Sequence, residues 1–302
     1  MIKNTKKQII TLPVPVLIRK DKVYRIQKPI YSLIVKIFFC FLYIKNFITL
    51  ICNNRFMEER KIKRIKTYVN GLDERMEGGI PAGYVVLVSG STGCMKSSFA
   101  FNVLYNAAKE KGEKGLYLSL EQSRESLGRH MKKINLDPDA VKNMVTIMDL
   151  GKLRKEIGED ALAMGFKVED GKKVSWMNAL REQIKNYREM LGFEILVIDS
   201  LDALCVLSAM DNPRNEMFHF FDGLRSLGLT TLVISEIHGD KKTFGKYGVE
   251  SFLSDGIIHL AMEREKRTVG RYISVVKMRE TKHATDYFPL LVTDKGFEIV
   301  AK

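Results

Sequence analysis

Cysteine is scarce in this chain, and its spacing excludes two common roles. The four cysteines, at positions 40, 52, 94 and 205, include no C-x-x-C pair and no metal-binding spacing. We therefore expect reduced thiols in a cytoplasmic protein, where a cysteine is usually a small packing residue. The interpretation as a reactive thiol stays open only for Cys94, because this cysteine lies two residues from Lys96.

A long hydrophobic run without charge is also missing. Residues 29–52 are apolar enough and long enough to cross a bilayer, but Lys36 and Lys45 interrupt them. No small-residue cleavage site of a signal peptide follows. Three interpretations stay open: a membrane-attached extension, an ordered part of the fold, or an upstream translation that precedes a natural start at Met57. We favour the third and divide the chain into residues 1–56 and a domain at 57–302.

An excess of positive charge is missing from most of the chain, although the formal net charge is +13. Residues 1–56 hold eleven lysines and arginines against the single acid Asp21, whereas residues 57–302 hold 38 basic and 35 acidic side chains. The second part is therefore nearly neutral. Binding of nucleic acid stays open but is not favoured, because such proteins usually carry a basic patch.

One stretch carries recognisable chemistry. Tyr84–Ser89 is typical of a buried strand, Gly90–Met95 of a glycine-bearing loop, and Ser98–Lys111 of an apolar helix. Such a loop wraps backbone N–H groups around phosphate oxygens, and the helix N-terminus adds its positive dipole end. The lysine reaches the outer phosphates and the hydroxyl after it binds Mg²⁺. We predict a nucleotide site made of Gly90, Ser91, Thr92, Gly93, Cys94, Met95, Lys96, Ser97 and Ser98.

The loop departs from the usual pattern G-x-x-x-x-G-K-[ST] at one position. Gly90, Lys96 and Ser97 match it, but Met95 stands where the second glycine is expected, and Gly93 adds a glycine inside the loop. If this position requires a positive φ, the methionine costs about 1–2 kcal/mol. A site that binds nucleotide without hydrolysing it therefore stays open.

Two further strands end in carboxylates. Gly115–Leu120 leads into Glu121, and we expect this strand beside the P-loop strand. Ile195–Ile198 leads into Asp199. Ligands bind at the carboxyl edge of open parallel sheets. Glu121 would polarise the water that attacks a γ-phosphate, and Asp199 would hold Mg²⁺ opposite Ser97.

The other elements are read from hydrophobic periodicity and turn residues. A strand at Thr230–Ser235 ends in Ser235-Glu236, where a phosphate-sensing hydroxyl and a plain strand terminus both stay open. The last quarter indicates strands joined by tight turns, an antiparallel extension of the sheet. The remaining predictions are helices at Asp73–Met76, Ser123–Ile134, Trp176–Leu191 and Arg214–Ser226, strands at Lys66–Tyr68, Met144–Leu150, Gly256–Met262, Arg271–Met278, Tyr287–Val292 and Gly296–Val300, and a surface excursion at Gly151–Val174.

With these pieces in order, the chain from Arg64 to Val300 resembles the RecA superfamily and, within it, the KaiC-type ATPases. The most specific matches are GVESFLSDGII at 248–258, VVKMRETKH at 275–283 and DYFPLLVTDKGFEIV at 286–300. Further matches are GLDERMEGGIPAGYVVLVSG at 71–90, the P-loop, Ser119-Leu120-Glu121, and LVIDSLDAL at 196–204.

The resemblance implies one α/β domain with a mostly parallel central sheet, helices on both faces and an antiparallel C-terminal extension. It also implies a homo-oligomeric ring, with a hexamer as one size, that binds ATP and Mg²⁺ between subunits. The catalytic residues would be Glu121, Lys96, Lys277 and Arg279, with Ser97 and Asp199 as the metal site. Gln122 departs from clock-type members, which carry a second acid there, and a single ATPase domain does not imply a circadian role.

The function that we expect is a slow, oligomeric, regulatory ATPase whose protein partner the sequence does not name. One alternative is a DNA-repair accessory of the recombinase-paralogue type, which would bind single strands in a salt-dependent way. Another is a scaffold that binds nucleotide without turnover, attached to a membrane if residues 29–52 are genuine. Turnover and DNA binding distinguish the three.

Overall fold

The computed structural model describes residues 16–19, 22–25, 62–151, 176–208, 212–237, 243–265 and 268–300. The chain divides into two units, Met1–Lys61 and Ile62–Lys302. In the first unit, β1 (Val16–Arg19) and β2 (Lys22–Arg25) pair as an antiparallel hairpin. The hydrophobic segment 29–52 and residues 152–174 of the expected excursion lie outside the described residues.

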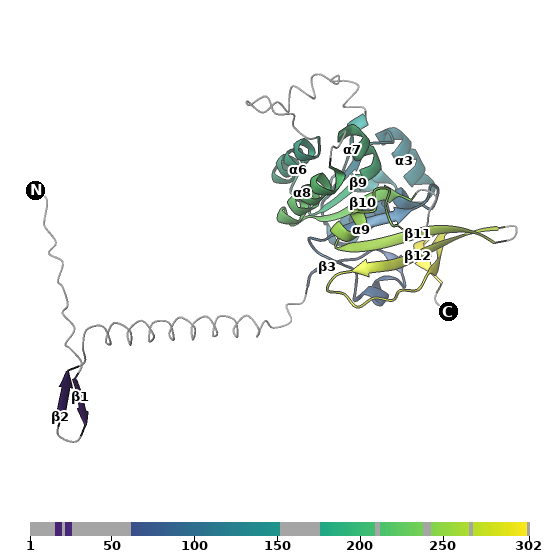
Figure 1. Cartoon of the computed structure of the whole chain (residues 1–302). Helices are drawn as coiled ribbons and strands as arrows, with labels where there is room; N and C mark the ends of the chain where they lie inside the picture. The colour runs from purple at the N-terminus through teal and green to yellow at the C-terminus, as the bar shows by residue number, and fades with distance from the viewer. Residues whose placement is uncertain are drawn as a thin grey trace, which may run out of the picture. The chain divides into compact units, whose positions relative to one another are not determined.

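A large sheet organises the second unit (Figure 1). It has ten strands in the order β4-β14-β13-β12-β11-β6-β10-β9-β7-β8. The six strands from β11 to β8 run parallel, whereas β12, β13 and β14 pair antiparallel. The bounds are β4 Val69–Asn70, β6 Val85–Gly90, β7 Gly115–Ser119, β8 Val145–Asp149, β9 Ile195–Asp199, β10 Thr230–Glu236, β11 Gly256–Glu265, β12 Thr268–Met278, β13 Phe288–Thr293 and β14 Gly296–Ile299. A separate small sheet pairs β3 (Arg64–Ile65) with β5 (Ile80–Pro81).

Helices cover both faces of this sheet. On one face α2 (Lys96–Lys111) and α3 (Arg124–Lys133) share an apolar core with the β-strands. On the other, α6 (Trp176–Leu191), α7 (Leu201–Ser208) and α8 (Pro213–Ser226) share a second core. Successive residues of a strand alternate between the two cores, because side chains of a strand point to opposite faces. The short elements are η1 Asp73–Met76, η2 Pro138–Val141 and α9 Glu250–Leu253.

The central strands are buried on both faces. Every residue of β6, β7 and β9 is buried, which explains why their sequences are nearly continuous apolar runs. The expected α/β fold, with helices on both faces and an antiparallel C-terminal extension, is confirmed. The antiparallel pairing begins one strand later than expected, since β11 runs parallel to β6.

Two local expectations are wrong. Residues 66–68 form no strand: Tyr68 has a φ of 56°, and the Asp73 carboxylate accepts the backbone N–H groups of Thr67 (2.7 Å) and Tyr68 (3.2 Å). These contacts replace a β-ladder. Also, β7 does not neighbour β6, because β10 and β9 lie between them. The chain therefore crosses over two strand positions after α2, which the order of elements in a sequence does not specify.

Candidate functional site

The phosphate-binding loop joins the end of β6 to the start of α2. Gly90 ends the strand, and a Cβ there would lie 2.2 Å from the Leu260 carbonyl oxygen and 2.6 Å from Cys94 Sγ. Only glycine fits between β11 and the loop at this point. Residues 91–93 are exposed, and α2 follows at Lys96 with its N-terminus toward the loop. The local structure is thus a strand, a tight exposed loop and a helix N-terminus.

Met95 keeps the backbone conformation of the glycine that it replaces. It precedes α2 with φ 74° and ψ 31°, in the left-handed region. Its side chain is partly buried and packs against the core beneath α2. The loop therefore holds its shape at a cost in backbone strain of about 1–2 kcal/mol, which this packing offsets in part.

Lys96 is drawn into the loop. Its side chain is 8% exposed, and its ammonium donates to the carbonyl oxygens of Gly90 (3.0 Å) and Ser91 (2.9 Å). The same nitrogen lies 3.7 Å from Glu236 Oε1 at the end of β10. The lysine is thus placed at the loop mouth, with an acidic partner opposite.

Ser97 and Asp199 lie together, as the sequence predicts for a metal site. Their side chains lie close enough for the Ser97 hydroxyl to act on the Asp199 carboxyl, and the hydroxyl of Tyr117 donates to Asp199 Oδ2 at 2.5 Å. Burial raises the pKa of the Asp199 carboxyl, and the hydrogen bonds from Tyr117 and Ser97 and the charge of Lys96 partly offset this. A carboxylate and a hydroxyl at one point supply the oxygen ligands that Mg²⁺ prefers.

Glu121 follows β7 at the same edge of the sheet. Its Oε1 accepts a hydrogen bond from the hydroxyl of Ser200, the residue after Asp199. The carboxylate is exposed, and it lines a hollow of about 350 Å³ together with Asp202, Glu236 and Lys246. An exposed carboxylate held at one oxygen can accept a proton from water beside the loop.

Lys277 and Arg279 lie at the opposite edge of the sheet, where the parallel strands begin, whereas Glu121 and Asp199 lie where those strands end. The Lys277 ammonium donates to the carbonyl oxygens of Ser251 (2.9 Å) and Ser254 (2.6 Å), and burial lowers its pKa. Arg279 pairs with Asp255 at 2.7 Å and lies level with the start of β6, whereas the loop follows its end. Because strands rise about 3.3 Å per residue, roughly 16 Å separates Arg279 from the loop. The two cations do not meet the phosphate-binding groups of their own chain.

Sequence reasoning missed three side chains of this edge: Tyr117, Ser200 and Glu236. Tyr117 was detectable as the one aromatic residue in β7, two positions before its end. The hydroxyl of Ser235, for which a phosphate-sensing role and a plain strand terminus both stayed open, is wholly buried and has no hydrogen-bond partner among the described residues. Glu236, one position later, is the side chain that faces the loop.

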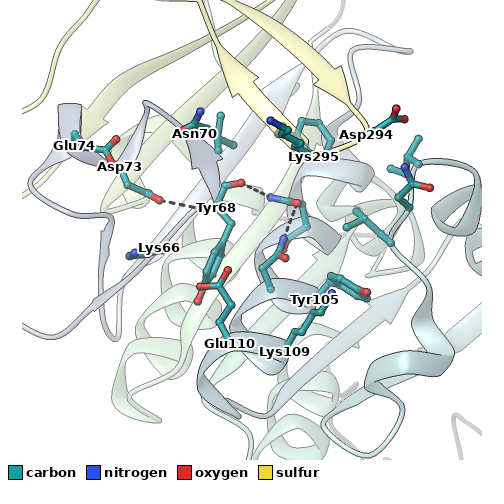
Figure 2. A pocket seen from close by; sticks show the side chains of 18 residues that line it. Lys66, Tyr68, Asn70, Asp73, Glu74, Tyr105, Lys109, Glu110, Asp294 and Lys295 are labelled. Carbon is teal, nitrogen blue, oxygen red and sulfur yellow. Dashed lines mark hydrogen bonds between the residues drawn. The ribbon is translucent and has the colours of Figure 1, made fainter.

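A second, polar hollow of about 360 Å³ lies along the flank of α2. Figure 2 shows it between α2, which carries Tyr105, Lys109 and Glu110, and the β13–β14 turn with Asp294 and Lys295. Its lining, within the described part of the chain, includes no residue of the loop 90–97. The hollow is therefore separate from the loop that would hold phosphates.

A phosphate-binding loop, a serine–aspartate pair and a strand-terminal glutamate on a mostly parallel sheet define a RecA-like P-loop ATPase. A family model described as the KaiC ATPase matches residues 65–302, and the chain belongs to this family. It is 33% identical over 241 residues to a UPF0273 protein of Thermotoga maritima, covering 79% of this chain and 96% of that one.

Two other relatives extend the comparison. The circadian clock oscillator protein KaiC of Synechococcus elongatus is 28% identical over 249 residues, which are 82% of this chain and 46% of that protein. The crystal structure of a KaiC-like protein from Pyrococcus horikoshii OT3 superimposes with a TM-score of 0.65 at 26% identity, covering 80% of this chain and 100% of that one. The recognition of the family from sequence is confirmed.

Within the described residues, no helix has the length and apolar character needed to span a bilayer.

Proposed function

We propose that the protein is a slow ATPase of the cytoplasm that works as a homo-oligomeric ring, with each ATP bound between two subunits. The observation that carries the proposal is the convergence of Lys96, the Ser97–Asp199 pair and Glu121 at one sheet edge, while Lys277 and Arg279 lie at the other. Two of the three cations expected at the site, Lys277 and Arg279, are thus out of reach of their own loop.

The loop side would bind the nucleotide. Lys96 and the N-terminus of α2 would hold the phosphates. Ser97 and Asp199 would hold Mg²⁺, which neutralises charge on the phosphates when bound. Tyr117 fixes the Asp199 carboxylate by its hydrogen bond to Oδ2, and the Ser97 hydroxyl lies beside both groups.

Glu121 would orient the attacking water and accept its proton. Ser200 holds one carboxylate oxygen of Glu121, whose side chain is exposed. We expect turnover with this single positioned carboxylate to be slow. Slow turnover in turn suits a regulator whose nucleotide state sets its conformation.

Lys277 and Arg279 would act on the nucleotide of a neighbouring subunit. Both sit on one short segment fixed at α9 and Asp255, so they would enter the next site as a unit. Cations supplied in this way neutralise charge that develops during phosphoryl transfer. Each site would then be complete only at a subunit interface.

A mixing experiment tests this arrangement. Lys96→Ala and Arg279→Ala each should abolish turnover of the full chain, because each lacks one half of the site. Mixed in equal amounts, the two variants should regain a substantial part of wild-type activity, since some interfaces then join an intact loop to an intact arginine. Wild-type specific activity should also rise with protein concentration and then level.

Other outcomes would favour other functions. Failure of the mixture to recover, with activity independent of concentration, would remove the role of Lys277 and Arg279 between subunits. Binding of ATP without turnover at any concentration would favour the nucleotide-binding scaffold. Salt-dependent binding of single-stranded DNA would favour the repair accessory.

A further inference from the structure

Glu236 is the last residue of β10 and lies directly beside the phosphate-binding loop. It is level with Gly90 of β6 in the parallel ladder. Its Oε1 accepts a hydrogen bond from Thr92 Oγ1 at 3.1 Å and lies 3.7 Å from the ammonium of Lys96. The side chain is 30% exposed. A carboxylate thus contacts two of the groups that the loop offers to phosphate oxygens.

The ammonium of Lys96 makes two hydrogen bonds and one longer charge contact in this arrangement. A lysine has three N–H donors, and here the carbonyl oxygens of Gly90 and Ser91 and the carboxylate of Glu236 surround it. The two carbonyl oxygens take two of these donors, so a phosphate would compete for the third with Glu236. Of the three contacts, only the carboxylate carries a charge of the same sign as the incoming phosphate.

We propose that Glu236 is an internal counter-ion of the phosphate-binding loop, which a nucleoside triphosphate must displace. In this role it lowers the affinity of the loop for nucleotide, more for ATP than for ADP. The inference rests on the proposed function and adds to it a residue that sets nucleotide preference. It concerns the approach of the nucleotide, not the chemical step.

The structure offers a route for this displacement. The backbone of β10 is held in place, because Glu236 N–H donates to Asp202 Oδ2 at 2.8 Å and Ile237 N–H donates to the Gly90 carbonyl at 3.1 Å. The side chain alone is free to turn. It lines the hollow of about 350 Å³ that also contains the exposed Lys246. Turned into this hollow, the carboxylate would exchange one cation, Lys96, for another.

The surrounding charge explains why the preference would depend on the third phosphate. Asp199, Glu121 and Asp202 lie at the same sheet edge as Glu236. Lys96 is the loop cation that reaches the outer phosphates, so the γ-phosphate would come closest to the site that the carboxylate holds. The γ-phosphate of ATP and the Glu236 carboxylate would then be like charges a few ångström apart, and their repulsion is strong in a partly buried site.

Calorimetric titration of the full chain with ATP and with ADP, in the presence of Mg²⁺, tests the proposal. Glu236→Gln keeps the shape of the side chain and removes its charge. We expect ATP to bind this variant about tenfold more tightly than wild type, and ADP to gain less, because the γ-phosphate brings the additional like charge. Lys246→Gln should weaken ATP binding, since the displaced carboxylate then lacks its second cation.

Glu121→Gln is the matched control. It removes the same charge from the same sheet edge but contacts neither Thr92 nor Lys96, so we expect a much smaller gain in ATP affinity. Equal gains in ATP affinity in both variants would show that any loss of negative charge at this sheet edge has the same effect, and would overturn the proposal. Unchanged or weaker ATP binding by Glu236→Gln would overturn it as well, the latter indicating a metal ligand.

The same titrations separate this inference from the proposed function. If wild type binds ATP and Glu236→Gln binds it equally, the counter-ion role fails and the ATPase stands. If neither protein binds any nucleotide, the proposed function fails and the inference with it.

Discussion

Tyr117 donates a 2.5 Å hydrogen bond to the carboxylate of Asp199 across two neighbouring strands, and both side chains are buried. The two residues are far apart in the sequence. Their contact lets a charged carboxylate remain beneath the phosphate-binding loop, because a hydrogen bond to the ionised form counteracts the cost of burial.

Tyr117→Phe removes this hydrogen-bond donor, so that less of the cost of burying the charged Asp199 carboxylate is offset. We expect the free energy of unfolding to fall by about 2 kcal/mol, the range for a hydrogen bond to a charged group. Urea denaturation at neutral pH measures this. Tyr105→Phe, which removes a hydroxyl on the flank of α2, should change stability by less than about 0.5 kcal/mol. Equal losses in the two variants would contradict the role of the contact.

Glu121→Gln should bind ATP and hydrolyse it at least about a hundredfold more slowly than wild type, because a positioned base typically contributes that much or more. Single-turnover hydrolysis and equilibrium binding measure the two properties separately. Glu125→Gln, in the first turn of α3, is the control and should keep wild-type turnover. Normal turnover in Glu121→Gln would exclude this residue as the base.

Met95→Gly and Met95→Ala together isolate the backbone strain of the loop. Both variants lose the partly buried side chain, but only glycine adopts a φ of 74° without penalty. We therefore expect Met95→Gly to be more stable than Met95→Ala by about 1 kcal/mol. Thermal or urea unfolding of the pair measures the difference. An alanine variant as stable as the glycine variant would show that this loop carries no such strain.

Asp255→Asn should weaken the attachment of the segment that carries Arg279. The Asp255 carboxylate is 6% exposed and accepts from Arg225 Nε (2.8 Å), Arg279 Nη1 (2.7 Å) and the backbone N–H of Val85 (3.0 Å). Removing its charge should cost about 2 kcal/mol of stability, less than a fully buried pair because Arg279 is half-exposed. Asp222→Asn, on the surface of α8, should have almost no effect. If Asp255→Asn left the free energy of unfolding unchanged, the pairing of Asp255 with the two arginines would contribute nothing to stability.

The same Asp255→Asn variant bears on catalysis. If Arg279 acts on a neighbouring subunit, a loosened arginine should lower turnover while ATP binding stays as in wild type. Turnover measured at a temperature well below unfolding distinguishes this from partial loss of fold.

The raised pKa of Glu250 predicts that the stability of the protein depends on pH. Burial raises the pKa of this wholly buried carboxyl, the nearby charge of Asp202 raises it further, and the backbone N–H of Tyr247 partly offsets both. The folded state therefore keeps its proton to higher pH than the unfolded state. Stability should fall as pH rises from the ordinary value of 4.5 through the raised one, and level above it.

Glu250→Gln removes this titration. The variant should be more stable than wild type by about 1 kcal/mol at pH 7.5 and show a flatter profile from pH 5 upward. The change also removes a negative charge that acts on Asp202, whose Oδ1 is buried without a hydrogen-bond partner among the described residues. Denaturation at several pH values measures the effect, and a variant less stable at pH 7.5 would contradict it.

The local elements of this protein follow from its sequence because their signals are local. The apolar runs of β6 and β9, the cap residue Ser123 before α3, and the proline that opens α8 each act over a few residues. Residues 66–68 were misassigned because their backbone N–H groups bond to Asp73, a contact that no hydrophobic pattern records.

The sequence by itself determined which residues end each parallel strand, and hence that Gly90, Asp199 and Glu121 belong to one sheet edge. Only the tertiary structure decided the order β6-β10-β9-β7, since pairing between strands depends on contacts distant in the chain. That order brings Glu236 against Lys96 and Tyr117 against Asp199. The antiparallel pairing of β12 with β11 places Arg279 at the opposite ends of the strands. The residues at which strands end depend on short stretches of sequence, whereas the order of the strands depends on the packing of the whole sheet.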